Sequence, residues 1–136
     1  MTFLLDTNAW IAYVRQTHAG LIRKVQQSGP ADIYLCSVVV AELYYGAFHG
    51  PLAYQAHNLA LLTQLRQQFQ SLPFDDSAAE HYGRIRADLA AKGTPIGPND
   101  LMIAAIALAD GLTLVTHNTV EFSRVSGLKL DDWQMP

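Results

Sequence analysis

Cysteine is almost absent from this chain of 136 residues, in which Cys36 is the single one. One cysteine cannot form a disulfide framework or a zinc site made of cysteine ligands. Charged residues are also scarce, at 15%, whereas hydrophobic residues make up 50%. Intrinsic disorder requires the opposite balance. We therefore expect one folded domain with one core over residues 1–136.

Long apolar runs and a basic leader are missing too. No run approaches the roughly 20 apolar residues that a membrane helix needs. The opening residues MTFLLDTN include an aspartate and no basic residue, unlike a signal peptide. We expect a soluble, cytoplasmic protein with no membrane partner. The net charge of −3 excludes coating of nucleic acid through bulk positive charge, but not an enzyme that binds nucleic acid locally.

Short apolar runs alternate with helical patterns along the chain. Strands are expected at 2–5, 33–36, 112–115 and, as a short last strand, 128–130. Helices are expected at 8–14, 21–27, 37–48, 52–69, 77–92 and 99–109, with Asn8 and Ser37 as N-caps. This alternation predicts an α/β fold, a three-layer sandwich whose central parallel sheet is flanked by helices.

Acidic residues follow the expected strands or begin the expected helices. Asp6 ends the first strand, Glu42 lies in the helix after the second strand, and Asp100 lies at a helix start. Ligand sites of parallel sheets lie beyond the carboxyl ends of the strands, so these carboxylates are expected to converge. Close carboxylates repel one another unless a cation neutralises them, and Mg²⁺ prefers oxygen ligands. Such a site suits metal-assisted hydrolysis of a phosphodiester.

Each of these acids also has a purely structural interpretation. Asp6 and Asp100 could be helix caps, and Glu42 could face solvent, although its apolar surroundings weaken that interpretation. A phosphatase with Asp6 as nucleophile would usually carry a second aspartate where this chain has Asn8. A non-catalytic module that binds RNA or protein is a further alternative.

Four segments together resemble the PIN-domain ribonucleases, and more closely the VapC toxins of bacterial toxin–antitoxin pairs. They are MTFLLDTN, SVVVAELYYG, GPNDLMIAA and LVTHNTVEF. Residues 85–97 and the ending after 122–125 resemble the subgroup that cuts initiator tRNA. The resemblance implies a PIN fold and a type II toxin that cleaves tRNA with Mg²⁺, for which Mn²⁺ could substitute. It also implies a VapB-type antitoxin as partner and a homodimer.

The resemblance also implies site residues. The catalytic set is Asp6, Glu42 and Asp100, with Asp6 and Asp100 as metal ligands, and the polar supports are Thr7 or Asn8, Ser37, Thr116 and Asn118. Many PIN enzymes have an aspartate where this chain has Asn118, so a second metal ion is not implied. Glu121, about one helical turn later, could substitute in part or could simply face solvent.

Basic and histidine side chains could complete the site. Arg84 and Arg86 lie in one expected helix and could hold phosphates, and Arg86 is the stronger candidate for RNA binding. His117 neighbours the expected site and could transfer a proton, although an exposed histidine at a strand end usually has no such role.

Aromatic residues have two interpretations. Trp10, Tyr13, Tyr44 and Tyr45 could stack on unpaired bases, but their helical spacing favours packing in the core or at an interface. The helix over 52–69 and the apolar stretch around Tyr44 suggest a groove, which in the resembled family receives the antitoxin.

Overall fold

The computed structural model describes residues 1–135. Five strands form one sheet in the order β3-β2-β1-β4-β5, and every neighbouring pair is parallel. The strands are β1 (Phe3–Leu5), β2 (Ile33–Cys36), β3 (Gln70–Leu72), β4 (Thr113–Val115) and β5 (Leu130–Asp131). The predicted central parallel sheet is therefore confirmed.

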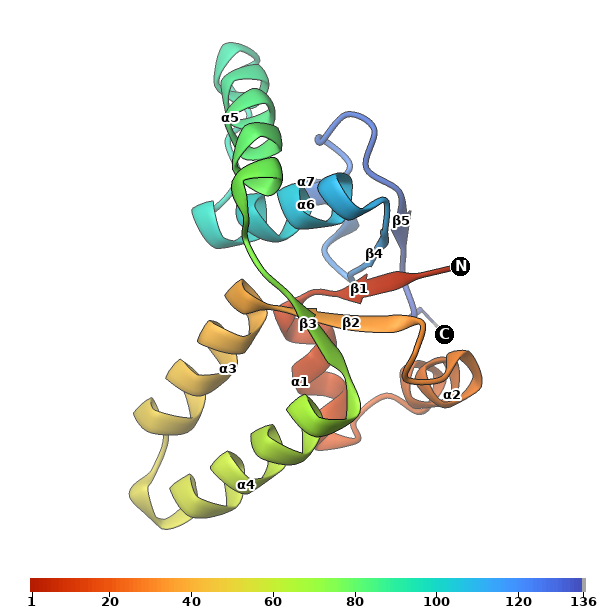
Figure 1. The fold of residues 1–136 in the computed structure, drawn as a ribbon, viewed down its shortest axis with the longest axis vertical. Coiled ribbons are helices and arrows are strands. Elements are labelled where there is room, and N and C mark those ends of the chain that lie inside the picture. The colour runs from red at the N-terminus through yellow and green to blue at the C-terminus, as the bar shows by residue number, and fades with distance from the viewer. Residues whose placement is uncertain (136) are drawn as a thin grey trace.

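Seven helices cover the two faces of this sheet in the described residues. They are α1 (Thr7–Arg15), α2 (Ala19–Ser28), α3 (Ser37–His49), α4 (Leu52–Gln68), α5 (Asp76–Ala91), α6 (Pro98–Asp110) and α7 (Thr119–Phe122). Figure 1 shows α1, α3 and α4 on one side of the sheet and α5 and α6 on the other. This confirms the predicted three-layer arrangement.

The core lies on both faces of the central strands. Leu4, Leu35 and Leu114, from three adjacent strands, are fully buried because helices cover both sides of the sheet. In α6 every residue from 103 to 107 is fully buried, and three of these five are alanines. Small side chains let this helix lie close to the sheet. In residues 1–135, no helix combines the length and the apolar character needed to cross a membrane.

Local structure differs from the sequence predictions at two caps and three short elements. The last strand, predicted over 128–130, is observed as β5 at Leu130–Asp131. Asp6, and not Asn8, is the N-cap of α1. Cys36, and not Ser37, is the N-cap of α3, and Ser37 is the first residue of that helix. The Ser37 hydroxyl accepts a hydrogen bond from the Phe74 amide. Neither β3 nor α7 was predicted, because each is short and carries no apolar periodicity.

The strand order reverses between β1 and β4, which lie side by side at the centre of the sheet. The backbone N–H of Asp6 donates to the carbonyl of Val115 at 3.0 Å, so the two strands end together. Such a reversal point is where parallel α/β sheets bind ligands.

Candidate functional site

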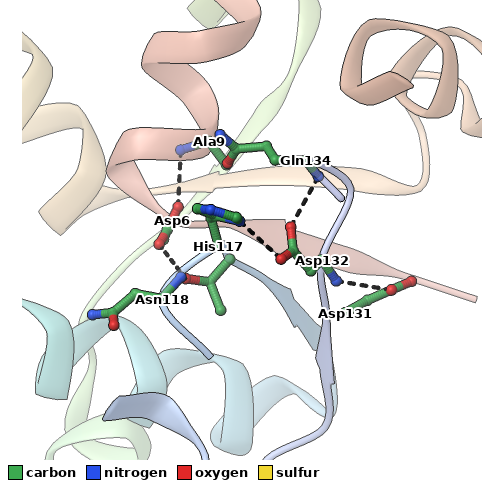
Figure 2. Close-up of polar contacts among 8 residues, drawn as sticks. Asp6, Ala9, His117, Asn118, Asp131, Asp132 and Gln134 are labelled. Atoms are coloured by element: carbon green, nitrogen blue, oxygen red, sulfur yellow. Dashed lines mark hydrogen bonds and ion pairs between the residues drawn. The ribbon is translucent and has the colours of Figure 1, made fainter. Parts of the chain in front are cut away.

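Asp6 lies at this reversal point and is only 5% exposed. One carboxylate oxygen accepts a hydrogen bond from the Ala9 amide at 2.9 Å (Figure 2), and the other accepts one from the Thr116 hydroxyl at 2.5 Å. Each oxygen keeps a second lone pair after these bonds. Asp6 therefore caps α1 and still has acceptor capacity for a ligand, so the structural and functional interpretations are compatible.

Glu42 lies in the second turn of α3 and is half-buried. Its Oε1 accepts a hydrogen bond from the hydroxyl of Thr7, the residue directly after Asp6. Of the two alternatives Thr7 and Asn8, the structure assigns this contact to Thr7, while Asn8 is exposed. The first turn of α1 thus orients the side chain of Glu42 toward the site.

Asp100 is half-buried in the first turn of α6, where a negative charge interacts favourably with the helix dipole. Burial raises the pKa of Asp100 to about 6, and the charges of Asp6, Glu42 and Glu121 add to the increase. The three predicted acids therefore share one electrostatic neighbourhood, although they come from three distant segments.

The pKa of Asp6 is raised as well. Burial is the largest cause, the hydrogen bonds from Thr116 and Ala9 oppose it, and the charges of Glu42 and Asp132 reinforce it. The raised pKa values of Asp6 and Asp100 both disfavour the ionised carboxylates. A cation would relieve this repulsion and favour the ionised carboxylates.

Thr116 and Asn118 connect Asp6 to Glu121. Thr116 is buried, and its hydroxyl donates to Asp6 and accepts from the backbone N–H of Asn118 at 3.0 Å. The Asn118 side-chain amide donates to Glu121 at 3.1 Å. Glu121 thus belongs to the polar network of the site and does not simply face solvent.

Ser37 borders this region with a different contact. Its hydroxyl accepts from the Phe74 amide at 3.1 Å and is not hydrogen-bonded to a carboxylate in the described part of the chain. Ser37 nevertheless lines a hollow together with Thr7 and Glu42.

Asp132 is a neighbour that sequence reasoning missed. Its Oδ2 lies 2.9 Å from His117 Nδ1, and Figure 2 shows this pair beside Asp6. Asp132 directly follows β5, so the rule that identified Asp6 finds it once the observed end of that strand is used.

Arg86 is exposed on α5, and its guanidinium donates to the Tyr82 hydroxyl at 3.2 Å. Arg86 and Tyr82 line a hollow of about 310 Å³ together with Pro98 and Leu101 of α6. Those two residues flank Asp100 in the first turns of α6. The arginine therefore lies on the helix pair that also carries one of the acids.

The four aromatic candidates have different surroundings. Trp10 is fully buried and packs edge-on against Phe69, with ring centroids 4.9 Å apart. Tyr13 is half-buried, as is Tyr44, which accepts a hydrogen bond from an arginine. Tyr45, by contrast, is 67% exposed. Packing accounts for Trp10, whereas the Tyr45 ring is accessible.

The donor set fits a hard divalent cation that keeps much of its water. Within residues 1–135, no three His, Cys, Asp or Glu side chains form a ready metal cluster. Mg²⁺ is usually held by one or two carboxylates, with water and substrate phosphate as further ligands. Asp6 and Asp100 both offer only carboxylate oxygens, which is the ligand type that Mg²⁺ prefers.

A third hollow, of about 310 Å³, lies between α1, α3 and α4. It is lined mainly by apolar side chains, which include Ile11, Val14, Leu43, Ala47, Leu61 and Leu62. This confirms a groove near the helix predicted over 52–69. None of the three carboxylates of the acidic site, which are Asp6, Glu42 and Asp100, lines this groove.

Known proteins resemble this chain over almost its entire length. The sequence profile of the PIN domain matches residues 3–128. The "tRNA(fMet)-specific endonuclease VapC" of Shigella flexneri is 39% identical over 133 residues, which cover 98% of both chains. "Ribonuclease VapC2" of Haemophilus influenzae is 34% identical over 98% of both chains.

Solved structures agree with these sequence matches. The DNA-bound VapBC structure from Salmonella typhimurium contains a chain that superposes with a TM-score of 0.89 at 39% identity, over 98% of both chains. A DNA-bound VapBC2 structure from Rickettsia felis gives the same TM-score at 30% identity, over 98% of this chain and 99% of the other. The chain belongs to the PIN-domain family and, within it, to the VapC ribonucleases.

Proposed function

We propose that this protein is a Mg²⁺-dependent endoribonuclease that cleaves tRNA and is the toxin of a type II toxin–antitoxin pair. The observation that supports the proposal is that Asp6, Glu42 and Asp100, from three distant segments, are near enough for the charges of Asp6 and Glu42 to raise the pKa of Asp100. Initiator tRNA is the proposed substrate, because relatives 39% identical to this chain are named for tRNA(fMet). The proposed place of action is the cytoplasm, where tRNA is found.

Asp6 and Asp100 would hold the Mg²⁺, for which Mn²⁺ could substitute. When bound, the metal lowers the pKa of a water and neutralises charge on the phosphate. Glu42 would orient the attacking water, since Thr7 fixes its carboxylate. Thr116 holds Asp6 in one orientation by its hydrogen bond. In-line attack would leave a phosphate on one product end and a hydroxyl on the other.

The neutral Asn118 brings no charge, so we propose a single stable metal ion. The side-chain amide of Asn118 donates a hydrogen bond to Glu121, and Glu121 contributes a fourth carboxylate to the neighbourhood of Asp100. Arg86 would contact a substrate phosphate from α5, which packs against α6. A local cation of this kind offsets the net charge of −3 in RNA binding.

The apolar groove between α1, α3 and α4 supports the proposal that this protein pairs with an antitoxin. Three solved structures that resemble this chain are structures of VapBC. We propose that a VapB-type antitoxin binds this chain and places apolar side chains in the groove lined by Leu43, Leu61 and Leu62. Homodimerisation, expected from the same family, is part of the proposal.

Cleavage of purified tRNA tests the nuclease directly. We expect the purified protein to cut initiator tRNA with Mg²⁺, to cut elongator tRNA much more slowly, and to be inactive with excess chelator. Asp100→Asn should lower the rate by at least about 100-fold. Asp88→Asn is the matched control, because Asp88 lies on α5 in an exposed pair with Lys92. Tight tRNA binding without any metal-dependent cleavage would instead support the non-catalytic binding module.

A further inference from the structure

A hollow of about 550 Å³ opens beside the acidic site, between α3 and α6. Thr7 and Glu42, which are hydrogen-bonded to each other, form part of its lining. Asn99, the residue before Asp100, lines it from α6. Whatever occupies this hollow therefore lies next to two of the three carboxylates. Its volume is within the range of small-molecule binding pockets.

Much of the remaining lining is apolar. Ala41 and Met102 contribute aliphatic and thioether surface, and Tyr45 contributes an aromatic ring that is 67% exposed. The Tyr45 ring stacks on His49, one helical turn later, with centroids 5.1 Å apart and an angle of 10° between the planes. This stacking fixes the orientation of the ring while most of the side chain stays accessible.

A flat ring at the edge of a hollow, next to polar groups, suits a nucleobase. Unpaired bases bind proteins by stacking on aromatic side chains and by hydrogen bonds to their edges. Asn99 is exposed, and its side-chain amide offers both a donor and an acceptor to such an edge. A base of a paired duplex is stacked on its neighbours and could not enter.

We propose that this hollow binds one unpaired base of the RNA substrate, stacked on Tyr45, next to the phosphate that is cut. The proposal rests on the ribonuclease function proposed above, because a phosphate at the carboxylates places its flanking base within reach of the hollow. It assigns a specificity role to Tyr45 and Asn99, and it explains why a large aromatic side chain is exposed beside the acids.

The test measures base stacking apart from cleavage. Short single-stranded RNAs carry 2-aminopurine at successive positions, and the protein carries Asp6→Asn so that the RNA stays intact. Binding should quench the fluorescence at one or two positions. Tyr45→Ala should abolish that quenching and weaken binding about tenfold. Tyr45→Phe keeps the ring and should stay within about twofold. A duplex with the same label should show no quenching.

The control is Tyr54→Ala, since Tyr54 is 62% exposed on α4 and lines neither the hollow nor the acidic site. It should change neither quenching nor affinity. Unchanged quenching with Tyr45→Ala would overturn the proposal. So would a change from dimer to monomer with unchanged RNA affinity, because Tyr45 would then contact a second copy of the chain.

The outcomes for the two proposals are separate. If the unmodified protein cuts tRNA and Tyr45→Ala binds and quenches normally, the base site is refuted and the nuclease stands. If the unmodified protein cuts no RNA but Tyr45-dependent quenching persists, the nuclease proposal fails and RNA binding in the hollow stands.

Discussion

The Thr116 hydroxyl donates a hydrogen bond to the Asp6 carboxylate although 110 positions separate the two residues in sequence. Asp6 follows β1 and Thr116 follows β4, and these strands are neighbours in the sheet. The bond is buried and lowers the pKa of Asp6, against the larger effect of burial. The reversal of strand order thus produces the contact that holds the central acid of the site.

Replacing Thr116 by valine should destabilise the ionised form of Asp6. A hydrogen bond to a charged group contributes about 1.5–3 kcal/mol, and we expect that loss in the free energy of unfolding at pH 7. The loss should shrink toward pH 4, because protonated Asp6 depends less on the donor. Urea unfolding at both pH values measures it.

The control for this change is Thr116→Ser, which retains the hydroxyl and should stay within about 1 kcal/mol of the unmodified protein. Cleavage of tRNA should fall at least about tenfold in the valine variant and much less in the serine variant. Equal unfolding free energies for all three proteins at pH 7 would contradict the role assigned to this hydrogen bond.

Asp100 should make stability depend on pH. Its folded-state pKa is about 6, above the ordinary value of 3.8, so the folded protein binds this proton more tightly than the unfolded chain. The free energy of unfolding should therefore fall as pH rises from about 4 to about 6, and should stay lower above that range. Without divalent metal, Asp100→Asn should be more stable at pH 7.5 by about 1–2 kcal/mol, allowing for its partial exposure.

Thermal unfolding at pH 4 and pH 7.5, with chelator present, checks this prediction. Asp88→Asn retains Asp100 and should therefore keep the pH dependence of the unmodified protein, and it should differ from that protein by at most about 1 kcal/mol at either pH, because the ion pair of Asp88 is exposed. A larger unfolding free energy at pH 7.5 for the unmodified protein than for Asp100→Asn would contradict it.

Gly111 should be sensitive to substitution because of its backbone conformation. It ends α6 with φ of 67°, in the left-handed region that favours glycine. Gly111→Ala should cost about 1 kcal/mol. Gly83, inside α5 with open space around it, is the control, and Gly83→Ala should stabilise by about 0.5–1 kcal/mol. Denaturant midpoints that moved in the same direction would refute this distinction.

Arg86 should contribute one phosphate contact. Arg86→Ala should weaken tRNA binding and reduce the dependence of log affinity on log salt concentration by about one. Arg84→Ala, on the same helix, should leave that dependence unchanged, because Arg84 contacts His81 and does not line the hollow beside α6. Filter binding of tRNA at several salt concentrations measures this dependence for the unmodified protein and the two variants. The same dependence in all three proteins would rule out a phosphate contact by Arg86.

The sequence was most informative where most residues of an element are buried. The strand over 33–36 was predicted at its observed bounds, because it is a short apolar run between turn signals. The strand β3 was missed, since Gln70 and Ser71 are exposed and continue directly from α4. Only its parallel pairing with β2 makes this segment a strand, and pairing partners are not visible in a local pattern.

The same contrast holds in the site. Asp6, Glu42 and Asp100 could be expected to converge, because strand ends and helix starts meet at one edge of a parallel sheet. The choice between Thr7 and Asn8 could not be made, since it depends on the rotation of α1 about its axis. Asp132 was missed because the last strand was predicted over 128–130, whereas β5 comprises Leu130–Asp131 and ends one residue later.

Binding of Mn²⁺ to the purified protein, followed by electron paramagnetic resonance, tests the central claim most directly. We predict one tightly bound ion at neutral pH, affinity reduced at least about tenfold by Asp6→Asn and by Asp100→Asn, and full affinity in Asp88→Asn. Equal Mn²⁺ affinity in all four proteins, or no bound ion in the unmodified protein, would contradict a cation site at these carboxylates.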